Sequence, residues 1–265
     1  MYTVTSVNDN YEGNTSEHET YQAAVDAARQ TAAEGYDVKI ERSSDNCICW
    51  SSEDSPILKW YEECDNEQWV NLTKGIGESS DKPSVYFDID GTLGMWYQDT
   101  RGMVYPDQVL NPHYHYFRNI EPHPFMIELA YELYSKGYDV CTISSSAKDT
   151  IRDKWEWLED HCPFIKDENR FFCPLGADKN EFIKGNAEIS ILVDDYKVNL
   201  EQWKGTPIKA INSINSASKD MICIDGHKAE TTHTAHWDKM MQSAVQTVSA
   251  IVDRKQICRD SYERD

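Results

Sequence analysis

The sequence predicts an α/β fold, in which a parallel β-sheet is flanked by helices and preceded by a small α+β domain. After residue 83, short apolar segments alternate with segments of helical periodicity, which favours parallel strands joined by right-handed crossovers. Residues 65–82 carry several Asn, Gly, Ser and Lys residues, a composition typical of a linker. We therefore expect two domains, residues 1–82 and 83–265.

The N-terminal domain is predicted from four segments. Residues 2–7 alternate like a strand, and residues 18–34 carry alanines at helical spacing before Gly35. Residues 38–42 and 47–51 resemble two further strands. The domain holds 6 basic and 17 acidic side chains but no catalytic constellation. We expect it to act in docking, dimerisation or substrate covering, with a protein partner or a second copy of the chain.

The second domain is predicted to alternate strands and helices along its whole length. The predicted strands are residues 85–87, 138–143, 170–173, 189–193 and 208–211. The predicted helical segments are residues 124–136, 149–160, 178–183, 200–203 and 236–253. The last segment is amphipathic, so we expect it to dock on the body of the domain.

Residues 94–120 interrupt this alternation and are predicted to form an irregular insertion. They include the aromatic side chains Trp96, Tyr97 and Phe117. Aromatic faces stack on planar bases and on sugars, which suits substrate binding. The alternative is that these rings pack the insertion onto the body of the protein.

Composition excludes several classes of protein. The net charge of −20 argues against a track for nucleic-acid phosphates, and it allows small anionic substrates only where a local cation screens the site. There is no apolar run of membrane-spanning length and no signal-peptide pattern, so we expect a cytoplasmic protein without membrane partners. The eight cysteines form no Cys-x-x-Cys pair, so the thiols are expected to be free.

Polar residues stand at the ends of the predicted strands. The first strand is followed by Asp88 and Asp90, the second ends at Ser144, Lys179 opens a helical segment, and a later strand ends in Asp194-Asp195. Because carboxyl ends of parallel strands meet at one edge of a sheet, these groups are expected to converge there. Carboxylates with an ammonium and a hydroxyl would hold Mg²⁺ and a phosphate group.

In this order the residues resemble the motifs of the haloacid dehalogenase (HAD) superfamily of phosphotransferases, which has a Rossmannoid sheet. Asp88-Ile89-Asp90-Gly91-Thr92 is similar to its first motif, Ser144 to the second, Lys179 to the third and Leu192-Val193-Asp194-Asp195 to the fourth. Segments around Tyr116, Phe172 and Val193 further resemble the bacterial and phage branch related to 5'(3')-deoxyribonucleotidases. The resemblance covers residues 83–212.

The resemblance implies a Mg²⁺-dependent phosphomonoesterase that forms a phosphoaspartyl intermediate. Asp88 would be the nucleophile, and Asp90 would be the general acid and then the general base. Mg²⁺ would lie between Asp88, the backbone carbonyl of Asp90 and Asp194, with Asp195 orienting the waters of the metal.

The phosphate would be held by Ser144 and Lys179, and Thr92 would brace the first motif beside it. Residues 94–120 would form the cap that selects the substrate, expected to be a nucleoside 5'- or 3'-monophosphate.

Several alternatives stay open at this level. The interval between Lys179 and Asp194 is short, so Lys184 is a second candidate for the phosphate-binding lysine. The substrate could instead be a sugar phosphate or a nucleic-acid 3' end, although the acidity counts against the latter. A different class is a non-catalytic regulatory protein that binds through residues 1–82, since fold alone does not fix function.

Overall fold

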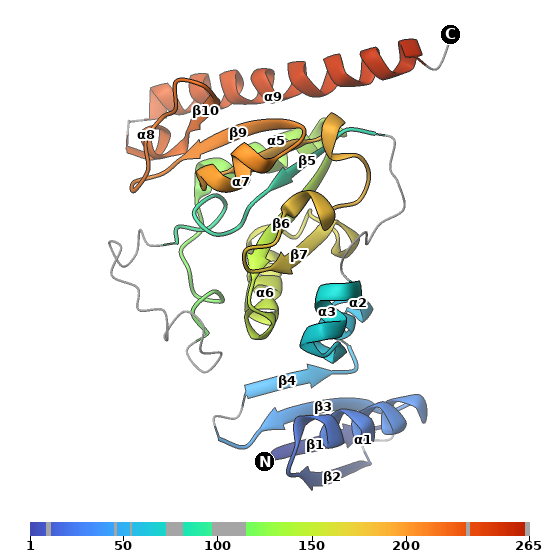
Figure 1. Cartoon of the computed structure of the whole chain (residues 1–265). Coiled ribbons are helices and arrows are strands. Elements are labelled where there is room, and N and C mark those ends of the chain that lie inside the picture. Colours follow the sequence, from blue (N-terminus) through green and yellow to red (C-terminus); the bar gives the residue numbers. More distant parts are fainter. Residues whose placement is uncertain are drawn as a thin grey trace. The chain divides into compact units, whose positions relative to one another are not determined.

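A computed structural model of the chain describes residues 1–8, 12–44, 47–53, 55–72, 82–96, 115–231 and 234–262. It divides into two compact units, Met1–Glu63 and Cys64–Asp265 (Figure 1). The sequence predicted a boundary near residue 82, whereas the division lies between Glu63 and Cys64.

Part of the predicted linker is helical. Helix α3 (Asn66–Leu72) begins with a capping box, in which the Asp65 side chain accepts from the N–H of Gln68 over 2.7 Å and the Gln68 side chain accepts from the N–H of Asp65 over 3.2 Å. Trp69 is buried on this helix. Residues 66–72 are therefore helical and not part of an extended linker, because the Asp65–Gln68 capping pair starts a helix just before the Gly- and Ser-rich stretch.

The first unit is a four-stranded antiparallel sheet that packs against one helix. Its elements are β1 (Tyr2–Val7), β2 (Gly13–His18), α1 (Tyr21–Ala33), β3 (Asp37–Arg42), β4 (Cys47–Ser51) and α2 (Pro56–Glu63). The strand order is β2-β1-β3-β4. The core comprises Val4, Ala24, Val25, Ala28, Val38, Ile40 and Trp50. This unit therefore has a core of its own.

Strand β2 was not predicted. Its sequence, Gly-Asn-Thr-Ser-Glu-His, has no apolar alternation, and every residue before His18 is exposed. The strand exists because it pairs with β1 along its whole length, at the edge of the sheet. An edge strand that buries no face leaves no hydrophobic pattern in the sequence.

The second unit is built on six strands in the order β10-β9-β8-β5-β6-β7, all parallel to their neighbours. The strands are β5 (Ser84–Phe87), β6 (Asp139–Ser146), β7 (Arg170–Pro174), β8 (Ile191–Asp194), β9 (Thr206–Ile211) and β10 (Ile222–Asp225). β5 and β8 are buried throughout, as expected for strands that are covered on both faces. The predicted α/β fold is confirmed, with β10 as an additional strand.

Helices flank this sheet (Figure 1). They are α5 (Pro124–Ser135), α6 (Ile151–His161), α7 (Lys197–Gln202), α8 (Gly226–Thr231) and α9 (Thr234–Tyr262). α9 starts close to the predicted position, extends beyond residue 253 and packs on α5, where the rings of Phe125 and Trp237 meet edge to face at 5.1 Å. Among the described residues, none of the helices combines the length and apolar character that a bilayer crossing requires.

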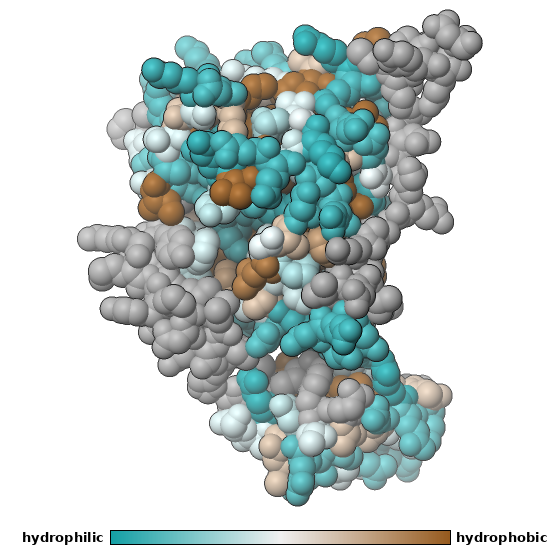
Figure 2. Space-filling model, in the orientation of Figure 1, coloured by the Kyte–Doolittle hydropathy of each residue, from teal (hydrophilic) through white to brown (hydrophobic). Residues whose placement is uncertain are grey.

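The surface is mainly hydrophilic, as expected for a chain of high net charge. On the face seen in Figure 2, the described residues are mostly hydrophilic, and the hydrophobic ones form small, separate patches. The apolar side chains gather instead in the core, where Tyr86 of β5 meets the rings of Phe171 and Trp203 edge to face. This packing holds β5 and β7 in place beneath the loops that follow them.

Candidate active site

The carboxyl ends of β5 and β8 bring Asp88 and Asp194 to one edge of the sheet. The strands are parallel neighbours, with Phe87 opposite Val193. The N–H of Asp88 continues this pairing by donating to the carbonyl of Val193 over 2.9 Å. Both carboxylates are buried, so they lie together where open α/β sheets bind their ligands.

Lys179 joins these two carboxylates. It opens the short 3₁₀ turn η4 (Lys179–Glu181) after β7, and its Nζ lies 2.8 Å from Asp88 Oδ1 and 2.8 Å from Asp194 Oδ2. A third bond of 3.0 Å goes to the carbonyl of Ile143. Burial lowers the pKa of Lys179, but the two carboxylates outweigh it and raise the pKa overall, so the ammonium stays charged.

Asp90 and Ser144 meet at a second lysine. Lys154 Nζ lies 2.5 Å from Asp90 Oδ2 and donates to Ser144 Oγ over 3.0 Å and to the Ser145 carbonyl over 3.1 Å. The Ser144 hydroxyl also donates to Asp90 Oδ2 over 3.5 Å. Asp90 Oδ1 is buried and has no hydrogen-bond partner among the described residues. Lys154 thus holds one oxygen of Asp90 and leaves the other available.

Sequence reasoning missed Lys154. The residue lies on α6 and is 1% exposed. A signal was present, because Ile151, Lys154 and Leu158 are spaced like one buried face of a helix, and a lysine there needs a buried anion. The anion it meets is Asp90.

Three carboxylates lie so close together that their negative charges repel one another. Asp88, Asp194 and Asp195 have carboxylate oxygens within 4.8 Å of one another. Burial, assisted by Asp194 and Asp90 and opposed by Lys179, raises the pKa of Asp88 to about 7. Burial and the charges of Asp194 and Asp88 raise the pKa of Asp195 well above its ordinary value. Such a cluster is stabilised by an additional positive charge.

The described residues here fit a divalent cation. Four carboxylates face two ammonium groups, which leaves an excess of two negative charges when all are ionised. The donors are hard oxygen atoms, the type that Mg²⁺ prefers. Asp88 and Asp194 would hold the cation beside the backbone of Asp90, while Asp195 lies against the same cluster.

The loops around the cluster are held by backbone and side-chain amides to which the sequence motifs assign no role. Asn199 of α7 donates to Asp194 Oδ2 over 2.9 Å, and the N–H of Tyr196 donates to Oδ1 over 2.7 Å. Asn212, which follows β9, donates to Asp195 Oδ2 over 2.9 Å. Asp194 and Asp195 therefore have fixed orientations before any ligand binds.

The other predicted site residues make no described contact with the carboxylate cluster itself. Thr92 is fully buried, and its hydroxyl has no hydrogen-bond partner among the described residues. Phe117 is buried, and its ring lies 4.4 Å from Lys154 Nζ. Trp96 is partly buried next to the first motif. Tyr97, like the rest of residues 97–114, lies outside the described residues.

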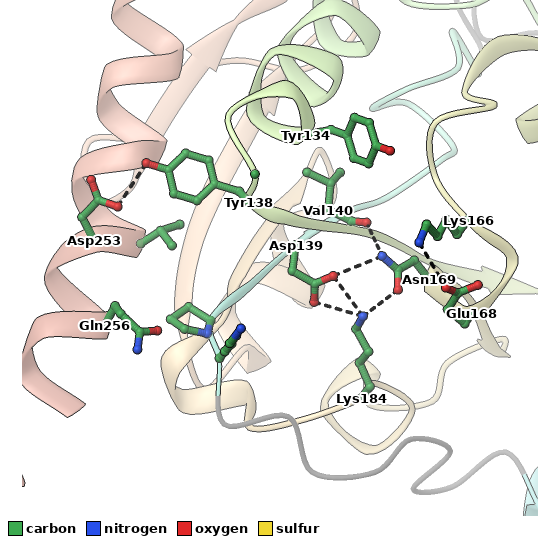
Figure 3. A pocket seen from close by; sticks show the side chains of 14 residues that line it. Tyr134, Tyr138, Asp139, Val140, Lys166, Glu168, Asn169, Lys184, Asp253 and Gln256 are labelled. Carbon is green, nitrogen blue, oxygen red and sulfur yellow. Dashed lines mark hydrogen bonds and ion pairs between the residues drawn. The ribbon is translucent and has the colours of Figure 1, made fainter. Parts of the chain in front are cut away.

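Lys184 lies at the opposite edge of the sheet. Its Nζ lies 3.0 Å from Asp139, the first residue of β6, and donates to Asn169 Oδ1 over 2.6 Å (Figure 3). These residues line a cavity of about 560 Å³ together with Tyr138, whose hydroxyl donates to Asp253 over 3.0 Å. Lys179, and not Lys184, is therefore the lysine at the carboxylate cluster.

The chain is similar to known nucleotidases over its second unit. Residues 85–234 match the model of the family described as 5' nucleotidase, deoxy (pyrimidine), cytosolic type C protein. A 5'(3')-deoxyribonucleotidase of Clostridium acetobutylicum is 33% identical over 94 residues, which are 36% of this chain and 47% of that protein. The match thus spans about half the length of this curated relative. A HAD hydrolase of family IA, variant 3, from Entamoeba histolytica aligns over 62% of this chain and 99% of its own, with 14% identity and a TM-score of 0.42.

Proposed function

Because this chain belongs to the 5' nucleotidase, deoxy (pyrimidine), cytosolic type C family, we propose that it is a Mg²⁺-dependent phosphomonoesterase. Its substrates are nucleoside 5'- or 3'-monophosphates, and the reaction passes through a phosphoaspartyl intermediate. The observation that carries the proposal is the arrangement of Asp88 and Asp90, two residues apart on one loop but held by different lysines. One carboxylate is thereby suited to attack and the other to proton transfer.

In the first step, a carboxylate oxygen of Asp88 attacks phosphorus and the bond to the ester oxygen breaks. Asp90, protonated at its unpartnered Oδ1, gives that proton to the departing ester oxygen, which leaves as the alcohol. In the second step, Asp90 takes a proton from water, and the water oxygen attacks phosphorus, which breaks the acyl phosphate and restores Asp88. Inorganic phosphate leaves.

The remaining residues stabilise charge during both steps. Lys179 and Ser144 would hold the phosphate oxygens, over which the charge of a transferring phosphoryl group is spread; their contacts with Asp88 and Lys154 support this role. Mg²⁺, when bound, would neutralise the charge that substrate and carboxylates share. Lys154 orients Asp90 by holding Oδ2. Asp195 would orient the waters of the cation.

Residues 94–120 are proposed as the cap that selects the substrate. Phe117 supports this, since its buried ring packs on Lys154 and so lies one side chain away from Asp90. Trp96 lies four residues after Thr92, the last residue of the first motif, and Tyr97 is part of the same proposal. Because Phe117 is buried, its proposed part is to anchor the segment beside the site, while Trp96 and Tyr97 would offer the aromatic faces that suit the planar base of a nucleotide.

The N-terminal unit is proposed as an accessory module. In the part of the chain that the structure describes, the carboxylate cluster and its lysines all come from the second unit. Residues 1–82, the range predicted from the sequence and one that includes this unit, would bind a protein partner or a second copy of the chain. The alternative, a regulatory protein without catalysis, makes the opposite prediction for the experiment that follows.

The test is phosphate release from a panel of nucleoside monophosphates and sugar phosphates, in Mg²⁺ and in EDTA. We expect release that requires Mg²⁺, with kcat/KM at least about tenfold higher for the best nucleotide than for any sugar phosphate, because the aromatic cap contacts a base. A sugar phosphate at the head of the ranking would contradict the nucleotide proposal. No release from any compound would favour the regulatory alternative.

A second experiment tests the intermediate. In Asp90→Asn, we expect p-nitrophenyl phosphate to give a burst approaching one nitrophenolate per enzyme, since this leaving group departs without a proton. Steady-state turnover should fall by about 10²–10⁴-fold, because the water is no longer activated. Rapid-mixing absorbance measures both phases, with Asp139→Asn as the control for loss of a lysine-bound carboxylate elsewhere. A linear time course at the reduced rate would argue against the two-step reaction.

A further inference from the structure

The turn after β9 is closed by two asparagines that bond to each other's backbone. Asn215 Oδ1 accepts from the N–H of Asn212 over 3.0 Å. Asn212 Oδ1 accepts from the N–H groups of Ile214 and Asn215, each over 3.1 Å. Asn215 Nδ2 donates to the carbonyl of Ala210 over 2.9 Å. Because the oxygen of Asn212 is used inside the turn, its NH₂ group must point outward.

That NH₂ group makes two bonds to two different loops. It donates to the carbonyl of Gly91 over 2.8 Å and to Asp195 Oδ2 over 2.9 Å. Asn212 is 2% exposed, so water does not compete for these bonds. Gly91 has a φ of +81°, and a Cβ on it would overlap the Asp195 carboxylate. The two loops are therefore in contact at the point where Asn212 joins them.

The joined loops carry the two halves of the carboxylate cluster. The loop of Gly91 holds Asp88 and Asp90, and the other begins at Asp195, directly after Asp194 at the end of β8. Carboxylates within 4.8 Å repel one another and would push the loops apart. A buried amide that donates to both loops opposes this separation.

We propose that Asn212 is a positioning residue that fixes the distance between the two carboxylate loops and thereby sets the affinity for the divalent cation. The inference rests on the proposed function only in taking the cluster as a cation site. It concerns binding without substrate, so it is tested separately from phosphate release. Asn212 lies outside every motif that identified the site.

The test measures Mn²⁺ binding to the full chain without substrate, from the electron paramagnetic resonance signal of free Mn²⁺. We expect Asn212→Ala to weaken binding by about 10–100-fold, as loss of a residue that orients metal ligands does. Asn212→Ser, which keeps a single donor, should bind with intermediate affinity. Mg²⁺ should compete with Mn²⁺ in each protein.

Asn169→Ala is the matched control. Its amide also joins a carboxylate and a carbonyl, Asp139 and Val140, but at the other edge of the same sheet. We expect wild-type Mn²⁺ affinity from this variant even if its melting temperature falls. Equal weakening in Asn169→Ala would overturn the proposal, because the effect would then be one of general stability.

The remaining outcomes also decide the question. Wild-type affinity in a folded Asn212→Ala, or failure of both Asn212 variants to fold even with Mn²⁺, would overturn the positioning role. A wild-type chain that binds no Mn²⁺ would do the same. A wild-type chain that binds Mn²⁺ but releases no phosphate would refute the proposed function and leave the role of Asn212 intact.

Discussion

Replacing Asp88 with asparagine is expected to lower phosphate release by about 10⁴-fold or more, the largest effect of any single substitution in this chain. The amide has nearly the same shape as the carboxylate but cannot act as the nucleophile. It can still accept from Lys179, which now lies 2.8 Å from Asp88 Oδ1. The measurement is kcat/KM on the best nucleotide of the panel, with Mg²⁺ present.

The control for Asp88→Asn is Asp139→Asn, which removes a carboxylate paired with Lys184 at the far edge of the sheet. This variant should retain activity within a few-fold. Thermal unfolding of both proteins establishes that the fold is intact. Activity of Asp88→Asn within tenfold of wild type would rule out the phosphoaspartyl reaction.

Replacing Lys179 with methionine is expected to destabilise the metal-free protein by about 3–5 kcal/mol at a pH above 7. The side chain is 2% exposed and contacts two buried carboxylates, which lose their shared cation in the variant. Phosphate release should fall by about 10²–10³-fold, because a group that holds the phosphate is lost. Urea unfolding in EDTA and the nucleotide assay measure the two effects.

The stability loss in Lys179→Met should depend on pH. Burial raises the folded-state pKa of Asp88 to about 7, and the charge of Lys179 keeps it from rising further. At a pH below this value Asp88 is protonated in both proteins, so the lysine has less charge to stabilise. The difference in unfolding free energy should therefore be smaller at about pH 5.5 than at about pH 8.5.

Lys184→Met is the matched control for Lys179→Met. Lys184 is also paired with a carboxylate, but its side chain is 20% exposed and solvent weakens the interaction. We expect a loss of about 1 kcal/mol or less and little change in phosphate release. If Lys179→Met lost no more unfolding free energy than Lys184→Met, the proposal that Lys179 neutralises the buried carboxylates would be contradicted.

Much of the site was predictable because its residues follow apolar strands directly. Asp88 follows β5, Ser144 lies in β6, and Asp194 ends β8. In a parallel sheet these positions share one edge, so local patterns suffice to bring distant residues together. The family match confirms the resemblance drawn from the same motifs.

Residues outside the motifs required the tertiary structure. Lys154 reaches Asp90 only because α6 packs with one face buried. The two residues are 64 positions apart, so no local sequence pattern indicates that they pair. Asn212 lies in a turn whose sequence, with two asparagines, does not differ from that of an ordinary polar loop. The exposed strand β2 is a third case, since only its pairing with β1 makes it a strand.

The sequence by itself determined the fold class, the family and the order of the charged residues, because short-range patterns of apolar and polar side chains suffice to predict each of them. Only the tertiary structure decided between Lys179 and Lys184. The chain leaves β7 at the carboxyl edge, where Lys179 lies, and must return to the amino edge to begin β8 as a parallel strand. Lys184 lies on that return and pairs with Asp139 at the start of β6. Two lysines close in sequence thus reach opposite edges of one sheet.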